Sequence, residues 1–270
     1  MSIEQQEGYA ANGIYFRTIG DGAPLLLLHG LMATGAMFDP FAELLKDRFL
    51  MLIPDLRGHG KSCSLPGPYD VPALAADLPV VLSELGVQKC AVLGYSHGGA
   101  VAQQFAHTQS ARVEKLMLVC TYACNVATPK ERVEANVLLT LLRFFSPGAL
   151  ANLVVQAMKP GRDKGEMGLT KEQARWLRSI MAQNGAAQMR GAARGLLTFD
   201  SRPWLKDICA PTLVVGGTHD SGVPRHHFDM LVRGIPNAFG RLVERAGHTL
   251  IWTHTRELAG IVRAQLGTGS

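Results

Sequence analysis

Short runs of apolar residues recur along the chain, each bounded by polar or turn-forming residues. Six of them have the length of strands and lie at residues 14–16, 24–28, 49–53, 90–93, 116–119 and 212–215. The later runs are nearly continuous and lack the alternation of a strand with one face in water. Such runs are typical of strands buried on both faces of a parallel sheet, so we expect helices on both sides of it.

Stretches with helical periodicity lie between these runs. The clearest cover residues 71–85, 99–107 and 256–266. A short hairpin around Asn12 and Gly13 is expected before the first buried strand. Strands that alternate with helices form βαβ units, so the pattern predicts an α/β fold.

The segment at 125–203 breaks this alternation. It contains no convincing strand and has helical patterns at 135–145 and 171–183. We expect it to be a helical cap inserted into a core made of residues 1–124 and 204–270. A cap over a cleft would turn some of its large apolar side chains toward a ligand. These side chains are Leu141, Leu142, Phe144, Phe145, Leu153, Met158, Trp176, Met181 and Met189.

The composition is that of a packed globular protein. The chain has 270 residues, of which 47% are hydrophobic and 18% are charged, and this composition excludes a disordered protein. One α/β domain with an insertion suits this length. The formal net charge is +5, but the basic residues are spread along the chain, so we expect a solvated surface and no nucleic-acid partner.

Several features predict a cytoplasmic protein. No run reaches the roughly 18 consecutive apolar residues of a membrane span, and residues 1–7 are polar and acidic, unlike a signal peptide. The cysteines are odd in number and scattered, so we interpret them as reduced thiols that bind no metal. They are Cys63, Cys90, Cys120, Cys124 and Cys209. We therefore expect no membrane partner and no metal site.

A G-x-S-x-G motif formed by Gly94, Ser96 and Gly98 lies between the expected strand at 90–93 and the expected helix at 99–107. In this context the motif is typical of a nucleophile elbow, a turn so tight that glycines must flank the serine. The turn would expose the Ser96 hydroxyl at the carboxyl end of the sheet, beside the amino end of a helix. Ser96 is therefore the candidate nucleophile, with Gly94 and Gly98 as the elbow glycines.

A serine nucleophile needs a histidine to accept its proton and an acid to orient that histidine. Of the nine histidines, His248 is the best candidate, because it follows a last apolar stretch at 241–244 and precedes the final helix. A loop at this edge of the sheet can reach the elbow. Asp220 follows the strand at 212–215, whereas the segment 121–125 after the preceding strand holds no carboxylate. We predict that His248 is the general base and Asp220 the acid.

An oxyanion hole would complete the site. One donor should be the backbone N–H of His97, the residue after the nucleophile, and the other the N–H of Leu31 in the loop after an early strand. In that loop we expect Gly30 to let the backbone turn inward. The His29 side chain is expected to hydrogen-bond within the loop and to take no part in catalysis.

These motifs resemble those of the α/β-hydrolase superfamily over essentially the whole chain. The similar segments are the oxyanion loop at 29–31, a D-x-R-G-H-G-x-S turn at 55–62, the elbow at 94–99, the acid loop at 217–224 and the base loop at 247–248. The order Ser, Asp, His is also that of the family. The resemblance implies a mostly parallel eight-stranded sheet with helices on both faces and a helical cap after the sixth strand.

A serine nucleophile favours acyl transfer and disfavours two enzyme classes of this superfamily. Haloalkane dehalogenases and epoxide hydrolases carry an aspartate where this chain has Ser96. The leading hypothesis is a carboxylesterase that cleaves a small to medium hydrophobic ester through an acyl-enzyme. We expect a small-molecule ester substrate, no cofactor, and a monomer or homodimer. A low-turnover ligand receptor with the same fold is a less favoured hypothesis.

A second enzymatic hypothesis is a carbon–carbon bond hydrolase or an enol-lactonase of aromatic degradation. Substrates of these enzymes carry carboxylates, so the pocket would need an arginine. The candidates for that role are Arg57, Arg143, Arg190 and Arg194.

Overall fold

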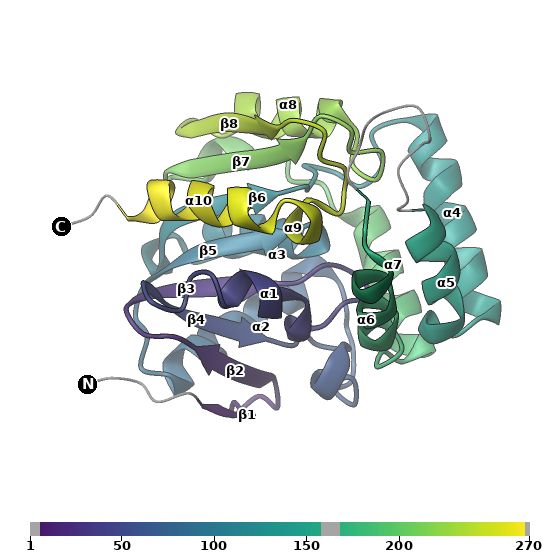
Figure 1. Ribbon diagram of the computed structural model, residues 1–270, viewed down its shortest axis with the longest axis horizontal. Helices are drawn as coiled ribbons and strands as arrows, with labels where there is room; N and C mark the ends of the chain where they lie inside the picture. The colour runs from purple at the N-terminus through teal and green to yellow at the C-terminus, as the bar shows by residue number, and fades with distance from the viewer. Residues whose placement is uncertain (1–5, 158–167, 268–270) are drawn as a thin grey trace.

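A computed structural model describes residues 6–157 and 168–267 of the protein, and an eight-stranded sheet lies at its centre (Figure 1). The strand order is β1-β2-β4-β3-β5-β6-β7-β8. Their bounds are β1 Glu7–Tyr9, β2 Tyr15–Ile19, β3 Ala23–Leu28, β4 Phe49–Pro54, β5 Cys90–Tyr95, β6 Val113–Val119, β7 Thr212–Gly217 and β8 Ala238–Val243. The expected runs all fall within or overlap these strands.

The sheet is mostly parallel, as expected. Strands β4, β3, β5, β6, β7 and β8 pair in parallel, while β2 runs antiparallel to both β1 and β4. The predicted hairpin around Asn12 and Gly13 is the connection between β1 and β2, with Gly13 at a positive φ of 80°. Parallel pairing brings the carboxyl ends of the central strands to one edge of the sheet.

Both faces of the sheet are buried, which explains why its strands are apolar at successive positions. In β3, Leu25 and Leu27 face one core, and Leu26 and Leu28 face the other. The helices α1 (Asp39–Ala42), α9 (Leu250–Thr253) and α10 (Thr255–Leu266) pack into the first core. The helices α2 (Val71–Glu84), α3 (His97–Thr108) and α8 (Arg225–Gly234) pack into the second. Short 3₁₀ turns occur at Gly35–Phe38, Gly60–Ser62, Ser110–Arg112 and Leu205–Asp207.

Among the described residues, four α-helices follow β6 and precede β7, and we call this group the cap: α4 (Pro129–Phe144), α5 (Pro147–Ala157), α6 (Lys171–Met181) and α7 (Ala186–Thr198). They lie together beyond the carboxyl ends of the strands, at the right of Figure 1. A bridge between Cys124 and Asp200 joins the two ends of the segment where it leaves and re-enters the core.

Helix α4 begins earlier than the helical pattern at 135–145 indicates. Thr128 and Glu131 form a capping box, and Pro129 occupies the first turn. These are strong signals for a helix start. The expectation was wrong at this end because the first turns of α4 are polar and show little apolar periodicity.

The large apolar side chains of the cap divide between its interior and its surface. Leu142, Met181 and Met189 are buried, whereas Phe144, Phe145 and Leu153 are exposed. Met158 lies outside the described residues. Among the residues that the structure describes, no helix has the length and apolarity needed to cross a membrane.

Candidate active site

The backbone of Ser96 adopts the strained conformation of a nucleophile elbow, with φ 53° and ψ −118° between β5 and α3. The flanking glycines leave no space for a side chain. A Cβ atom at Gly98 would lie 2.1 Å from the carbonyl oxygen of Leu28, and one at Gly94 would lie 2.4 Å from the carbonyl oxygen of Gly98. Helix α3 begins at His97, so its amino end lies directly behind the serine.

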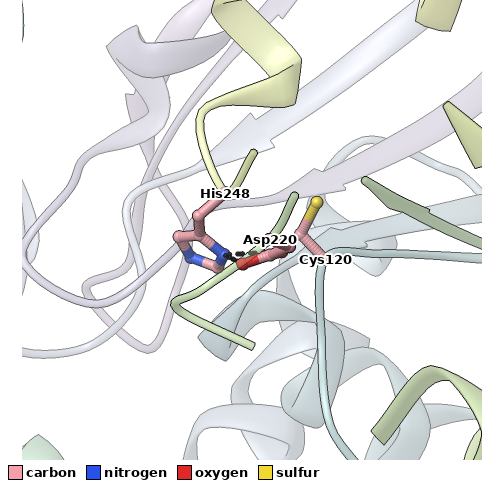
Figure 2. Close-up of side chains that lie close together, drawn as sticks. All are labelled: Cys120, Asp220 and His248. Carbon is pink, nitrogen blue, oxygen red and sulfur yellow. Dashed lines mark hydrogen bonds and ion pairs between the residues drawn. The ribbon is translucent and has the colours of Figure 1, made fainter. Parts of the chain in front are cut away.

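The structure brings Ser96, His248 and Asp220 together from three separate loops. The Nε2 atom of His248 lies 3.1 Å from the Oγ atom of Ser96. On the other side of the ring, Nδ1 lies 3.1 Å and 3.2 Å from the two carboxylate oxygens of Asp220 (Figure 2). These distances allow a proton to pass from the serine to the imidazole while the carboxylate fixes the ring.

The electrostatics of the pair favour a charged carboxylate and a basic imidazole. Burial disfavours the protonated form of His248, but the charge of Asp220 and its hydrogen bond outweigh burial, so the pKa of His248 is raised. Burial raises the pKa of Asp220, but the charge of His248 and the hydrogen bond from the backbone N–H of Val223 lower it by more, so the pKa of Asp220 is lowered overall. A carboxylate in this state stabilises the imidazolium that forms during proton transfer.

Cys120 lies beside Asp220, and the sequence did not indicate a place for it in the site. It follows β6 at a positive φ of 48°, and its side chain is buried. The thiol of Cys120 lies within 4.8 Å of a carboxylate oxygen of Asp220 and contributes to the lowered pKa of that carboxyl group. Figure 2 shows Cys120 and His248 on opposite sides of Asp220. The feature that marks Cys120 is its positive φ, which is uncommon for a non-glycine residue. No sequence pattern predicts this conformation, so the sequence could not indicate it.

Two further hydrogen bonds fix the loops of the site. The hydroxyl of Tyr95 donates to the backbone carbonyl of His248 and so ties the base loop to β5. The hydroxyl of Thr121 donates to the carbonyl of Ser96 at 2.6 Å. Tyr95 directly precedes Ser96 in the sequence, and Thr121 contacts Ser96 across the sheet edge. The sequence analysis assigned no role to either residue.

The loop after β3 lies next to Ser96, and its close approach occurs at Gly30. Gly30 has no positive φ; the left-handed residue of this loop is Met32, at φ 60°. A Cβ atom at Gly30 would be a tight fit, because it would lie 3.3 Å from the Tyr95 ring and 3.4 Å from Cβ of Ser96. Asn184 of the cap, another residue not predicted, donates a hydrogen bond of 2.9 Å to the carbonyl of Met32.

The side chain of His29 is held within the core, in agreement with the sequence prediction. Its Nε2 accepts the backbone N–H of Leu56 at 2.9 Å, and its Nδ1 lies 2.9 Å from the carbonyl of Gly30. Burial lowers its pKa to about 4. A neutral imidazole in this position holds the loop after β3 against the loop after β4.

Two cavities meet at Ser96 and His248. The larger has a volume of about 240 Å³, and Glu131, Glu134 and His227 are among the residues that line it. The smaller has a volume of about 60 Å³ and is mainly apolar. The smaller cavity is lined from the cap and core by Met32, Val154, Leu177, Met181 and Trp252.

None of the four candidate arginines lines either cavity. Arg57 is paired with Asp77 through contacts of 2.5 Å and 2.8 Å. Arg143, Arg190 and Arg194 line a separate hollow on the outside of the cap. Within the described residues, the cavities at Ser96 therefore contain no arginine that could pair with a substrate carboxylate.

Residues 23–255 match the model of a protein family described as the alpha/beta hydrolase fold. The chain belongs to the α/β-hydrolase family. Its fold and the order of its motifs agree with this assignment, and the assignment makes it a hydrolase.

The chain is similar to several named proteins over most of the length of both chains. The chain is 32% identical to the pimeloyl-[acyl-carrier protein] methyl ester esterase of Aeromonas salmonicida, over 92% of this chain and 97% of that protein. It is 29% identical to the poly(3-hydroxyalkanoate) depolymerase of Ectopseudomonas oleovorans, over 88% of this chain and 82% of that protein. A solved structure of a thermophilic esterase from Thermogutta terrifontis matches with a TM-score of 0.83 at 27% identity, covering 98% of each chain.

Proposed function

We propose that this α/β-hydrolase is a carboxylesterase that cleaves a small to medium hydrophobic ester through an acyl-enzyme on Ser96. The observation that carries the proposal is the position of the His248 ring, whose Nε2 lies 3.1 Å from Ser96 Oγ and whose Nδ1 lies 3.1 Å from Asp220. The names of two relatives, a methyl ester esterase and a depolymerase, support ester chemistry.

In the proposed reaction, Ser96 Oγ attacks the ester carbonyl carbon as His248 Nε2 takes the hydroxyl proton. The tetrahedral intermediate collapses, the carbon–oxygen bond to the alcohol breaks, and His248 gives its proton to the departing alkoxide. A water molecule, deprotonated by His248, then attacks the acyl carbon; the bond to Ser96 Oγ breaks, the acid leaves, and His248 returns the proton to the serine. Asp220 remains ionised throughout and stabilises the imidazolium.

The backbone N–H groups of His97 and Leu31 are the proposed oxyanion donors. His97 is the first residue of α3, where N–H groups have no partner within the helix. Leu31 lines both cavities together with Ser96. Two such donors stabilise the negative charge that develops on the carbonyl oxygen.

The cavities favour an uncharged ester over an anionic substrate. The small apolar cavity suits a short hydrocarbon group, and neither cavity has an arginine lining among the described residues. This observation counts against the carbon–carbon hydrolase and enol-lactonase hypothesis, in which a basic residue would pair with a carboxylate.

The test is hydrolysis of p-nitrophenyl esters of graded acyl length by the wild-type protein and by Ser96→Ala, purified in parallel. We expect release of nitrophenol with an optimum at a short or medium chain, and a loss of several orders of magnitude in the variant. Wild-type activity that survives in Ser96→Ala would overturn the assignment of the nucleophile. Inactivity of the wild-type protein toward every ester would overturn the proposed carboxylesterase function.

A further inference from the structure

A second cluster of chemically active side chains lies between the cap and the core, and two of its members, Glu131 and His227, line the larger cavity at Ser96. Glu131 of α4 faces His226 and His227 at the start of α8. The Oε1 atom of Glu131 lies 2.8 Å from Nε2 of His226 and 3.0 Å from Nε2 of His227. One oxygen and two imidazole nitrogens, from segments about 95 residues apart, therefore converge on one point.

From these contacts we propose that Glu131, His226 and His227 form a zinc-binding site that joins the cap to the core. Two imidazoles and one carboxylate are a ligand set that Zn²⁺ accepts, with a fourth position left for water. The three ligand atoms lie within 4.8 Å of one another, so small side-chain movements would bring them to the roughly 2.0–2.2 Å of zinc–ligand bonds.

The two histidines each have a ring nitrogen without a hydrogen-bond partner among the described residues, which leaves them free to bind a metal. The Nε2 atom of His226 is buried and, although close to Glu131, has no hydrogen-bond partner of acceptable geometry among the described residues. His227 is 3% exposed, and its Nδ1 has no partner there either. When Nε2 of His227 binds the metal, its proton moves to Nδ1, so the ring binds as the neutral form that metals require.

The carboxylate is held in place by the helix start that it caps. The Oε2 atom of Glu131 accepts hydrogen bonds of 2.8 Å from the backbone N–H groups of Ala127 and Thr128. This leaves Oε1 directed at the histidines. Such support by neighbouring groups is typical of metal ligands and keeps the carboxylate from rotating away.

The site is accessible to a metal ion from solvent. The side chain of His226 is 41% exposed, whereas those of Glu131 and His227 are buried. Glu134, one turn further along α4 and exposed, lines the same cavity and adds negative charge near the entrance. The metal would thus enter at His226 and be held by the two buried ligands.

The test measures Zn²⁺ binding to untagged, chelator-treated protein by isothermal titration calorimetry at pH 7.5, with melting temperature as a second readout. We expect one Zn²⁺ per chain and a rise in Tm of a few degrees, because a ligand that binds only the folded state stabilises it. His226→Asn should weaken binding at least tenfold and abolish the rise in Tm. Glu131→Gln, whose side-chain oxygen can still accept the two backbone hydrogen bonds, should do the same.

Two control variants locate the metal. Cys120→Ala removes a ligand from the other cluster that could hold an ion, Cys120 with Asp220 and His248, and His254→Asn removes a histidine away from both. Both should bind Zn²⁺ like the wild type. Loss of binding in Cys120→Ala, unchanged binding in His226→Asn, or no binding by the wild type would each overturn the proposal.

Discussion

The buried thiol of Cys120 lies within 4.8 Å of a carboxylate oxygen of Asp220, and His248 lies on the other side of that carboxylate (Figure 2). Cys120 adopts a positive φ, an uncommon conformation for a residue with a side chain, at the point where its backbone passes the acid of the site. A thiol is a weak hydrogen-bond donor, and here it helps to keep the carboxyl group ionised. We interpret Cys120 as a positioning residue that acts through Asp220.

Cys120→Ala should lower kcat/KM for a p-nitrophenyl ester roughly 2–10-fold, the effect of losing one polar interaction of about 0.5–1.5 kcal/mol beside the carboxylate. The acid limb of the pH–rate profile should also move, because Asp220 loses a group that favours its charged form and the charge of Asp220 in turn sets the pKa of His248. Cys120→Ser, which keeps a donor, should restore most of the activity. An unchanged pH profile in the alanine variant would show that Cys120 only fills space.

The pH dependence of ester hydrolysis should report the raised pKa of His248. Only the neutral imidazole can accept the Ser96 proton, so activity should fall as the pH is lowered through this pKa. Because the shift is upward, the midpoint of the acid limb should lie above the ordinary value of about 6.5. The measurement is kcat/KM from pH 5 to 9.

Asp220→Asn is the matched variant for this profile. Without the carboxylate charge, burial dominates, so the pKa of His248 and the acid limb should both shift downward. We expect kcat to fall by about 10³–10⁴-fold, as for other serine hydrolases that lose the acid. A limb at the same pH in both proteins would contradict the assignment of that limb to His248.

The small apolar cavity should set the preference for acyl length. Met181→Ala enlarges it from the cap side and should move the optimum toward longer acyl chains. Each additional buried CH₂ group contributes about 0.8 kcal/mol, roughly fourfold in kcat/KM. Leu153→Ala, an exposed substitution on the same cap, is the control and should leave the optimum unchanged. The same optimum in Met181→Ala would mean that the acyl chain lies in the other cavity.

The buried histidines behind the nucleophile should make the fold sensitive to acid. Burial lowers the pKa of His29 to about 4, and that of His59 and of His97 to about 3. The unfolded chain protonates near pH 6.5, so it binds more protons than the folded protein below that pH. The free energy of unfolding should therefore fall as the pH drops from about 6.5 toward 4, by about 1.4 kcal/mol per pH unit for each histidine.

Urea denaturation at pH 7 and pH 5 measures this loss. His97→Leu removes one of the three groups and should reduce the loss between the two pH values by about 2 kcal/mol. His254→Asn, a variant outside this cluster, should retain the full loss. An equal loss in His97→Leu and the wild type would show that His97 is not among the groups that titrate on unfolding.

Local sequence patterns were sufficient to predict the sheet and the residues that now lie together at Ser96. The continuous apolar runs predicted strands buried on both faces, and the order of the strands then placed the loops of Ser96, Asp220 and His248 at one edge. The start of α4 was predicted too late, because capping there depends on Thr128 and Glu131 and not on apolar spacing.

The sequence by itself determined the fold class and the candidate triad, because strand periodicity, the elbow glycines and the position of a residue after a strand are all local properties of the chain. Only the tertiary structure decided which side chains of different segments meet. The pairing of Arg57 with Asp77 depends on how α2 packs beside the loop after β4. The convergence of Glu131 on His226 and His227, and the choice of Met181 over Leu153 for the cavity, depend on how the cap packs on the core. That packing minimises exposed apolar area and unpaired polar groups over the whole molecule at once, so no single stretch of residues specifies it.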